Sequence, residues 1–265
     1  MSEARIPAVV LAGQRGPTTP LSEAANVAAD VMVPVAGRPA LLRVIDTLLQ
    51  ARGVRPSVMV GPARTILDDC EELADLMREH SVAWQQPKGD PATSSIAGVE
   101  SLPTPVLITT GDHALLTPRM VDDFCARALT VDADLVFGLV PYARVREAFP
   151  NSRRTVLRFA DEPCCGANLF LLKQSRGIRA LEFWRDMQQH RKRPQRIARA
   201  LGVGLLLSYV CRRLTLAAAL EVLSAKAGCR LGVVKINDAT AAVDVDSVAD
   251  WHLAERILSG DLQRA

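Results

Sequence analysis

Short runs of apolar residues alternate along this sequence with longer segments in which apolar residues recur at helical spacing. Such alternation is typical of parallel β-strands joined by crossover helices. The sequence therefore predicts an α/β fold with a mostly parallel sheet and helices on both of its faces. We predict strands near residues 8–12, 57–61, 82–84, 106–110, 133–140, 166–172, 232–236 and 242–245. Helices are predicted at residues 40–51, 64–79, 119–129, 177–189, 216–227 and 248–258.

The size and composition of the chain allow a compact core. Its 265 residues are 49% hydrophobic and 23% charged, which is close to the average of globular proteins. The formal net charge is +3, and aromatic residues make up 4% of the chain. So small a charge attracts nucleic acid weakly, and so few aromatic residues leave few surfaces on which bases can stack. We therefore expect no nucleic-acid partner.

The N-terminus and the cysteines are typical of a cytoplasmic protein. The chain begins with polar Ser2 and Glu3 and lacks the basic region and long apolar stretch of a signal peptide. Its longest apolar run, residues 203–211, is much shorter than the roughly 20 residues that a membrane-spanning helix needs. The cysteines lack the paired spacing of a zinc site, so we expect reduced thiols.

Residues 177–228 interrupt the regular alternation of strands and helices. This region is predicted to be mostly helical, and we interpret it as a helical insertion within a single domain of residues 1–265. It contains the densest cationic run of the chain, between His190 and Arg199. Such a run is either a solvated surface, a site for an anionic substrate, or a peripheral contact with anionic lipid beside the apolar segment 203–210.

The first predicted strand ends in a glycine-containing loop. Gly13 and Gly16 let backbone N–H groups come close to the oxygens of a polyphosphate, and the guanidinium of Arg15 adds further donors. The alternative is that the glycines only allow the positive φ that turns between strands and helices often need. The residues assigned to this candidate nucleotide loop are Leu11, Ala12, Gly13, Gln14, Arg15 and Gly16.

A second motif, residues 33–39, reads Val-Pro-Val-Ala-Gly-Arg-Pro and leads into the helix predicted at 40–51. The Leu-Ala-Gly element of the loop followed by this motif resembles the nucleotidyltransferases of the molybdenum cofactor guanylyltransferase type. The resemblance covers the chain almost from end to end. It implies a three-layer, Rossmann-like fold of the GT-A type. It also implies an Mg²⁺-dependent enzyme that transfers a nucleotidyl group from a nucleoside triphosphate to a phosphorylated acceptor, with release of pyrophosphate.

A candidate metal ligand, Asp112, follows the strand predicted at 106–110 and Gly111. Open α/β sheets bind ligands beyond the carboxyl ends of their strands, so Asp112 should lie at the mouth of the site. In the family resembled, the aspartate at this position binds Mg²⁺, and Gly111 belongs to the nucleotide site. The alternative, that Asp112 caps the following helix, is weaker because Thr117 can serve that purpose.

Two more carboxylates, those of Asp244 and Asp246, alternate with valines near the C-terminus. In a strand at residues 242–245 they would share one side, where they repel each other unless a cation or a proton joins them. The resemblance matches Asp246 to the family's second metal-binding aspartate, with Asp244 as a further ligand. Asp250 is predicted to cap the helix that follows. The predicted metal ligands are Asp112, Asp244 and Asp246, and the predicted catalytic residues are Arg15, Asp112 and Asp246.

The segment 85–95 follows the strand predicted at 82–84. In the family resembled, the corresponding loop contacts the nucleobase and the ribose, which makes Gln86, Gly89 and Ser95 candidates for nucleotide binding. An ordinary surface loop that leads into a serine-capped helix explains these residues equally well. The segment does not indicate which base is bound.

One residue departs from the family's pattern. The family usually carries a lysine a few residues before the Val-Pro-Val element, where it neutralises charge at the α-phosphate, and the matching residue here is Asp30. Loss of this cation costs several kcal/mol of transition-state stabilisation. Either Arg15, Arg38 or Lys88 takes over its role, or the protein is a nucleotide-binding pseudoenzyme that acts as a sensor.

A glycosyltransferase that uses a nucleotide sugar is a third interpretation, because Asp244-Val245-Asp246 matches an Asp-x-Asp metal motif of enzymes with the same general architecture. The position of the motif argues against this interpretation. In glycosyltransferases it normally follows a strand in the middle of the sheet, where this chain has Gly111 and Asp112.

Overall fold

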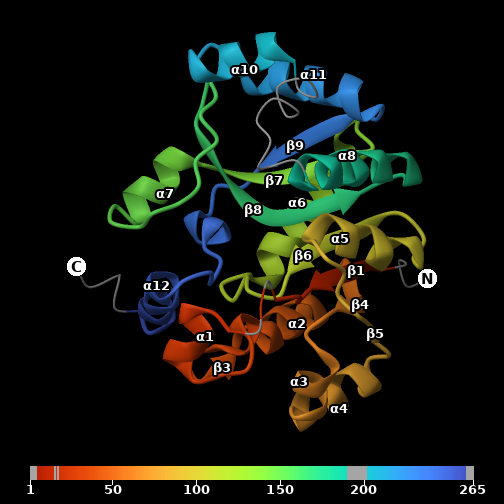
Figure 1. The fold of residues 1–265 in the computed structure, drawn as a ribbon, viewed down its shortest axis with the longest axis vertical. Helices are drawn as coiled ribbons and strands as arrows, with labels where there is room; N and C mark the ends of the chain where they lie inside the picture. Colours follow the sequence, from red (N-terminus) through yellow and green to blue (C-terminus); the bar gives the residue numbers. More distant parts are fainter. Residues whose placement is uncertain (1–4, 15, 17, 190–201, 261–265) are drawn as a thin grey trace.

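The computed structural model describes residues 5–14, 16, 18–189 and 202–260. Its main strands are β1 (Ile6–Leu11), β4 (Val54–Val60), β5 (Ala83–Gln85), β6 (Val106–Thr110), β7 (Leu135–Pro141), β8 (Cys164–Leu172) and β9 (Leu231–Lys235). They form a seven-stranded sheet in the order β5-β4-β1-β6-β8-β7-β9 (Figure 1). Only β8 runs antiparallel to its neighbours, β6 and β7. The predicted mostly parallel sheet is confirmed.

Helices and short elements occupy the connections between the strands. The helices are α1 (Pro20–Ala25), α2 (Ala40–Gln50), α3 (Arg64–Asp68), α4 (Glu71–Glu79), α5 (Pro91–Glu100), α6 (Pro118–Thr130), α7 (Tyr142–Ala148), α8 (Ile178–Gln189), α10 (Val203–Val210), α11 (Leu216–Ala227) and α12 (Val248–Leu258). Three 3-10 turns are η1 (Asp30–Met32), η2 (Ser175–Gly177) and η3 (Ala239–Ala242), and a small hairpin pairs β2 (Pro34–Val35) with β3 (Arg38–Pro39).

Helices cover both faces of the sheet, because successive side chains of β1 pack into two different buried clusters. Ala8 and Val10 belong to one buried cluster, and Val9 between them belongs to another. The first cluster contains Leu41 and Ile45 of α2 and Phe124 of α6, and the second contains Ile96 of α5 and Leu181 of α8. Successive side chains of a strand point to opposite faces, so these clusters are two separate helix layers. The expected three-layer fold is confirmed.

Two helices begin at the predicted caps. The hydroxyl of Thr117 accepts a hydrogen bond from the backbone N–H of Met120 at 3.3 Å, and Pro118 occupies the first turn of α6. The hydroxyl of Ser247 accepts one from the N–H of Asp250 at 3.2 Å at the start of α12. The Asp250 carboxylate in turn accepts from the Ser247 hydroxyl at 2.6 Å. The bonds from Met120 and Asp250 satisfy backbone N–H groups that have no partner inside the helix.

The single helix predicted at 64–79 is wrong in detail, because it is divided into α3 and α4. Cys70 between them has φ −117° and ψ 86°, outside the helical region. Glu71 and Glu72 then occupy the first turn of α4, where negative charge interacts favourably with the helix dipole. The acidic residues therefore start a new helix instead of continuing the previous one.

The strand predicted at 242–245 is also wrong. This part of the chain is η3 followed by an extended segment that pairs with no strand among the described residues. Val243 and Val245 are fully buried, whereas Asp244 is half-buried and Asp246 exposed. The predicted alternation of buried valines and accessible aspartates is therefore correct. The extended backbone, however, has no strand partner in the described part of the chain; the buried valines and a hydrogen bond from Val245 N–H to the Asp112 carbonyl at 3.0 Å hold it in place.

Several helices have no clear signal in the sequence. The helices α1 and α7 have only six and seven residues, too few to show a helical period. The helix α5 buries small residues such as Ala92, Ser94 and Ser95, which resemble a loop in composition. Small residues are needed there because α5 lies close to β1, and a Cβ atom on Gly98 would lie 2.6 Å from a methyl group of Val9.

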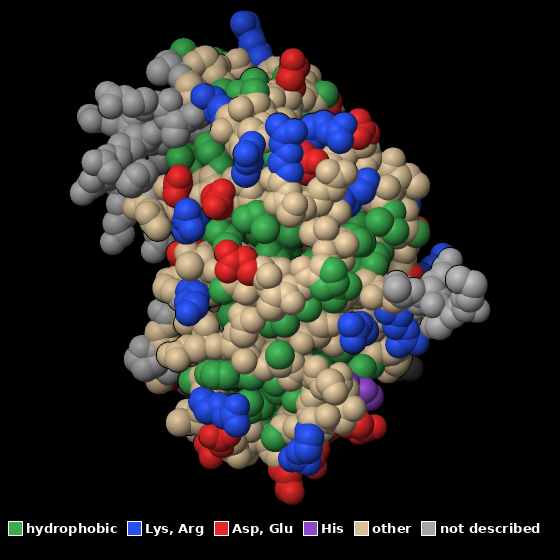
Figure 2. All heavy atoms as spheres, turned by 90° about the vertical axis from the view of Figure 1, so that its right-hand side faces the viewer, with side chains coloured by type: hydrophobic (Ala, Val, Ile, Leu, Met, Phe, Trp, Pro, Cys, Tyr) green, Lys and Arg blue, Asp and Glu red, His purple; other side chains and the backbone are tan. Residues whose placement is uncertain are grey.

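The region predicted to be mostly helical contains η2, α8, α10 and α11 within its described part. The face of the molecule to the right in Figure 1, which carries α8 and α5, exposes hydrophobic side chains between charged side chains of both signs (Figure 2). All six cysteines are free, as expected. Within the described residues, no helix combines the length and apolar character that a membrane-spanning segment needs.

Candidate active site

A cavity of about 600 Å³ lies at one edge of the sheet, where three neighbouring parallel strands end. Its wall includes Val60, Leu11 and Thr110, the last residues of β4, β1 and β6. This is the edge at which open α/β sheets bind ligands, because the loops that follow the strands diverge there. The cavity is therefore the candidate active site.

Three carboxylates meet in this cavity. Asp112 follows β6, and Asp244 and Asp246 follow η3, yet one oxygen of each lies within 4.8 Å of the others. The hydrogen bond from Val245 to the Asp112 carbonyl ties the two segments together. The structure thus brings together all three residues that the sequence analysis assigned to a metal. Carboxylate oxygens at this spacing suit a hard divalent cation.

The electrostatics of Asp112 also suit a cation. Burial, together with the negative charges of Asp244 and Asp246, raises the pKa of Asp112 to about 7 from the ordinary value of 3.8. The hydroxyl of Thr110 donates a hydrogen bond to this carboxylate and partly offsets the rise. A cation among the three carboxylates would remove the repulsion that keeps this proton bound.

Two residues that the sequence analysis missed hold Asp244 in place. Arg154 Nη1 donates to Asp244 Oδ1 at 3.2 Å, and Asn168 Nδ2 donates to Asp244 Oδ2 at 3.1 Å. The second Nη of Arg154 donates to Asp250 at 2.5 Å, and the arginine side chain is only 6% exposed. Arg154 lies in a segment without periodicity, so no pattern marks it. Asn168 could have been noticed, because asparagine is uncommon inside a strand.

Asn168 reaches the cavity because the backbone of β8 is distorted there. Its φ is +47°, in the left-handed region that asparagine tolerates better than most residues. The pairing of β8 with β7 shifts register opposite this point, between Phe137 and Leu139. Such irregularities re-aim side chains near ligand sites. Here the Asn168 amide points at the Asp244 carboxylate.

We expect Arg154→Met to destabilise the fold. Asp244 and Asp250 would lose their shared cation, and the free energy of unfolding should fall by roughly 2 to 4 kcal/mol, because both carboxylates are mostly buried. Chemical denaturation measures this change. The control is Arg127→Met, which removes the exposed pair with Asp123 and should cost about 0.5 kcal/mol or less. Equal losses in the two variants would mean that Arg154 has no special role.

The glycine-containing loop borders the cavity in part. Leu11, Gly13 and Gln14 line it, and Ala12 lies buried behind them. Neither Gly13 nor Gly16 has positive φ, so the turn does not need glycine for that reason. A Cβ atom on Gly13 would lie 3.0 Å from the Cβ of Pro87, so at Gly13 close approach explains the glycine. Gly16 is exposed and does not line the cavity, and Arg15 lies outside the described residues.

Two other glycines support this loop from behind. Gly61 has φ +87°, and a Cβ atom there would lie 2.8 Å from the backbone of Ala12 and Gly13. A Cβ atom on Gly111 would lie 2.9 Å from a methyl group of Leu41. Gly111 does not line the cavity, although it was predicted to belong to the nucleotide site. Its absent side chain leaves room for α2 to pack against the loop.

The segment after β5 contributes a different set of residues from those expected. Gly89, a candidate for nucleotide binding, lines the cavity together with Lys88, Asp90 and Ser94. Gln86 is exposed outside it. Ser95 is buried in α5, where its hydroxyl donates to the Pro91 carbonyl at 2.8 Å. The neighbouring Ser94 instead accepts a hydrogen bond from the backbone N–H of Lys88 at 3.0 Å and fixes the turn.

Asp30 lines the cavity and accepts a hydrogen bond from the hydroxyl of Thr19. The cavity wall therefore carries a carboxylate at the position that the resemblance assigns to the family's usual lysine. Of the cations considered as substitutes, Arg38 is paired with Asp46 at 2.6 Å and Glu72 at 2.7 Å, outside the cavity wall. Lys88 does line the cavity.

The helix α8 also reaches the cavity, through Trp184 and Gln188. The Trp184 ring stacks on Phe170 of β8, with ring centroids 6.3 Å apart. These two residues were not predicted, because a tryptophan on an amphipathic helix resembles an ordinary core residue. The cationic run between residues 190 and 199 lies outside the described residues.

His113 lies in the core behind Asp112. It is 1% exposed, and neither ring nitrogen makes a hydrogen bond of normal geometry within the described structure. Burial lowers the pKa of His113 to about 4, although Asp244 and the Ala241 carbonyl favour its charged form. The imidazole is therefore neutral at pH 7. It does not line the cavity.

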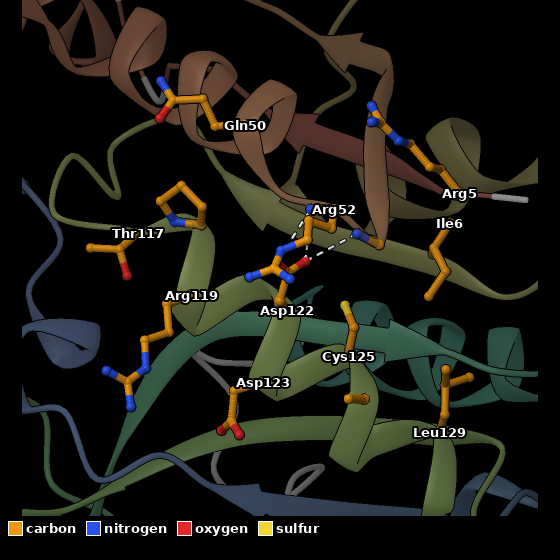
Figure 3. Close-up of a pocket in the computed structure, with 13 residues that line it drawn as sticks. Arg5, Ile6, Gln50, Arg52, Thr117, Arg119, Asp122, Asp123, Cys125 and Leu129 are labelled. Atoms are coloured by element: carbon orange, nitrogen blue, oxygen red, sulfur yellow. Dashed lines mark hydrogen bonds between the residues drawn. The ribbon is translucent and has the colours of Figure 1, made fainter. Parts of the chain in front are cut away.

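A larger depression of about 1170 Å³ lies at the opposite end of β1, next to Ile6 (Figure 3). Arg5, Arg52 and Arg119 border it, and the Asp122 carboxylate accepts hydrogen bonds from the backbone N–H groups of Arg52 and Gly53, both at 3.0 Å. Asp122 thus fixes the chain after α2. This depression contains none of the three clustered carboxylates, so the smaller cavity is the better candidate for the active site.

This sheet and the carboxylate cluster beyond its central strands agree with the nucleotidyltransferase resemblance noted in the sequence. The profile of the MobA-like NTP transferase domain matches residues 8–230, so the chain belongs to this family. A search of curated proteins found no match.

Solved structures share this fold. A hypothetical transferase from Thermus thermophilus is 29% identical, with a TM-score of 0.77 over 94% of this chain and 100% of that one. A 4-diphosphocytidyl-2C-methyl-D-erythritol synthase from Anaerococcus prevotii is 12% identical, with a TM-score of 0.57 over 96% of each chain. The CTP:phosphocholine cytidylyltransferase of Streptococcus pneumoniae is 13% identical, with a TM-score of 0.55 over 96% and 100%.

Proposed function

We propose that this protein transfers a nucleotidyl group from a nucleoside triphosphate to a phosphorylated acceptor in an Mg²⁺-dependent reaction that releases pyrophosphate. The cluster of Asp112, Asp244 and Asp246 in the cavity beyond β1 and β6 is the observation that carries the proposal. Three carboxylates this close repel one another unless a proton or a cation joins them, and a bound Mg²⁺ would relieve the repulsion.

In the proposed reaction, an oxygen of the acceptor phosphate attacks the α-phosphorus in line with the leaving group. A new P–O bond joins acceptor and nucleotide, the bond between the α-phosphorus and the bridging oxygen breaks, and pyrophosphate leaves. The protein's task is positioning and charge stabilisation. The loop at Gly13 and Gln14 would hold the triphosphate, and Lys88, which follows Pro87 beside Gly13, would add a positive charge.

Asp112 and Asp246 would hold the Mg²⁺, with Asp244 as a further ligand. When bound, Mg²⁺ neutralises charge on the phosphate oxygens and fixes their orientation. Both oxygens of Asp244 already accept hydrogen bonds, from Arg154 and Asn168. Each of these oxygens keeps a second lone pair, so Asp244 could still contact the cation, in an orientation that Arg154 and Asn168 fix.

The acceptor would be the phosphate of a small polyol, a sugar, a cofactor or a lipid headgroup. CTP is the first nucleotide to test, because similar folds include a synthetase complexed with CTP and a CTP:phosphocholine cytidylyltransferase. Gly89 and Ser94, on the segment after β5, would lie near the nucleoside.

A nucleotide sensor without catalysis is the second candidate, and Asp30 in the cavity wall favours it. The carboxylate adds negative charge where the triphosphate would bind. A sensor would bind a triphosphate and Mg²⁺ but release no pyrophosphate with any acceptor.

The experiment that tests the proposal is a pyrophosphate-release assay with each common nucleoside triphosphate and a panel of phosphorylated acceptors. We expect release that needs both one acceptor class and Mg²⁺, and that stops when the metal is chelated. Calorimetry with the same triphosphates provides the complementary result. Binding without release on every acceptor would identify the sensor, and consumption of a nucleotide sugar would identify a glycosyltransferase.

A further inference from the structure

The helix α10 is apolar and yet lies on the surface. Its residues Val203–Val210 include three consecutive leucines, and none of its described side chains is buried. Leu207 is 59% exposed and Val210 is 75% exposed, more than any other large hydrophobic side chain among the described residues. Exposed apolar surface of this kind marks a contact with a partner or a membrane.

Positive charge adjoins this apolar helix. Arg212 and Arg213 follow Cys211, the residue after α10. Both are exposed, and neither has an ion-pair partner within the described part of the chain. The sequence carries no aspartate or glutamate between Met187 and Leu220. A surface that combines exposed apolar side chains with unpaired arginines is complementary to anionic lipid, whose headgroups attract the cations and whose acyl chains receive the apolar groups.

The position of α10 leaves it accessible to a large planar surface. It lies with α11 at one end of the longest axis of the molecule, at the top of Figure 1. The segment before β8 supports it there, because the Tyr209 hydroxyl accepts a hydrogen bond from the backbone N–H of Arg158 at 3.2 Å. Leu157 beside this contact is 36% exposed and extends the apolar surface.

We propose that α10, together with Leu157, Arg212 and Arg213, forms a docking surface for a membrane that contains anionic lipid. The helix is too short to span a bilayer, so it would lie in the interface with its leucines among the upper acyl chains. This proposal concerns where the protein works and does not depend on the acceptor or on catalysis.

Vesicle sedimentation tests the proposal. The full-length protein is mixed with vesicles of phosphatidylcholine alone or with about one third phosphatidylglycerol. We expect binding to the anionic vesicles that weakens as salt is added. Leu207→Gln with Val210→Gln should weaken it by about tenfold or more, because both apolar groups leave the bilayer. Arg212→Gln and Arg213→Gln should each weaken it by about fivefold.

The control is Leu129→Gln with Leu258→Gln, which removes two other exposed leucines, 46% and 40% exposed, far from α10 in sequence. It should bind vesicles like wild type. Circular dichroism checks that all variants fold, as expected for exposed positions. Absence of binding to anionic vesicles, or equal binding by the α10 variants, would overturn the proposal. Sedimentation velocity without lipid tests the alternative that a second copy of this chain covers α10. Self-association that only the α10 variants lose would show such a contact between copies.

Discussion

Asp112→Asn is expected to lower turnover by more than about a hundredfold at saturating triphosphate and Mg²⁺. The substitution keeps the shape of the side chain and removes its negative charge. Asp112 lies within 4.8 Å of the two other carboxylates and is the only one of them that follows a central strand. The amide would weaken the hold on the cation and leave the charge of the triphosphate poorly neutralised. Steady-state kinetics over a range of Mg²⁺ concentrations measures the loss.

The same variant is expected to be more stable than wild type when Mg²⁺ is absent. The folded-state pKa of Asp112, about 7, lies above the ordinary value of 3.8, so the folded protein binds this proton more tightly than the unfolded chain does. The ionised carboxylate therefore opposes folding, and the free energy of unfolding falls as the pH rises through this interval. Asparagine does not ionise, so at pH 8 the Tm of Asp112→Asn should exceed that of wild type.

Asp123→Asn is the matched control for both measurements, because Asp123 is an exposed aspartate of α6 outside the cavity. It should change neither turnover nor Tm appreciably. Normal turnover of Asp112→Asn with saturating Mg²⁺ would show that the metal assignment is wrong. A fall in its Tm would show that the carboxylate contributes to the fold instead of to the site.

Asp30→Lys is expected to raise turnover, or the affinity for the triphosphate, by about tenfold or more. The substitution changes the charge of the cavity wall by two units at the position where the family usually has a lysine. Its cation would neutralise negative charge that develops around the α-phosphate. Initial-rate kinetics gives the turnover, and calorimetry gives the triphosphate Kd.

Two further variants separate the effect of losing the negative charge of Asp30 from the effect of gaining a cation. Asp30→Asn removes the negative charge without adding a cation and should give a smaller gain than Asp30→Lys. Thr19→Ser keeps a hydroxyl that can cap α1 and donate to Asp30, so it should change the rate little. If neither turnover nor affinity responds to Asp30→Lys, then another cation, such as Lys88 or Arg15, already fills the role.

The sequence predicted those parts of the fold whose pattern is repeated over several residues. The strand at 106–110 and the helices at 216–227 and 248–258 agree with the structure to the residue, because each has a strong apolar pattern and clear boundaries. The helix α5 was weighed only as an alternative and its bounds were not predicted, because its buried face consists of small residues that allow close approach to β1. Periodicity of large apolar residues does not reveal such packing.

The candidate site was predictable where it depends on short motifs. Asp112, Asp244 and Asp246 were assigned together from the sequence, and their carboxylates meet in the structure. Arg154 and Asn168 were not predicted, because their partnership with Asp244 arises from a loop conformation and a strand irregularity that leave no periodic pattern. Contacts between single polar residues that lie far apart in the sequence can be identified only in the folded chain.

The destination of the α- and γ-phosphates of the triphosphate tests most directly whether the protein transfers a nucleotidyl group. The protein is incubated with Mg²⁺, a phosphorylated acceptor and a nucleoside triphosphate that is radiolabelled at either the α- or the γ-phosphate. We predict that the α-label appears in the acceptor product and the γ-label in pyrophosphate, and that Asp112→Asn abolishes both. Transfer of the γ-label to the acceptor, or binding of the triphosphate without any transfer, would contradict nucleotidyl transfer.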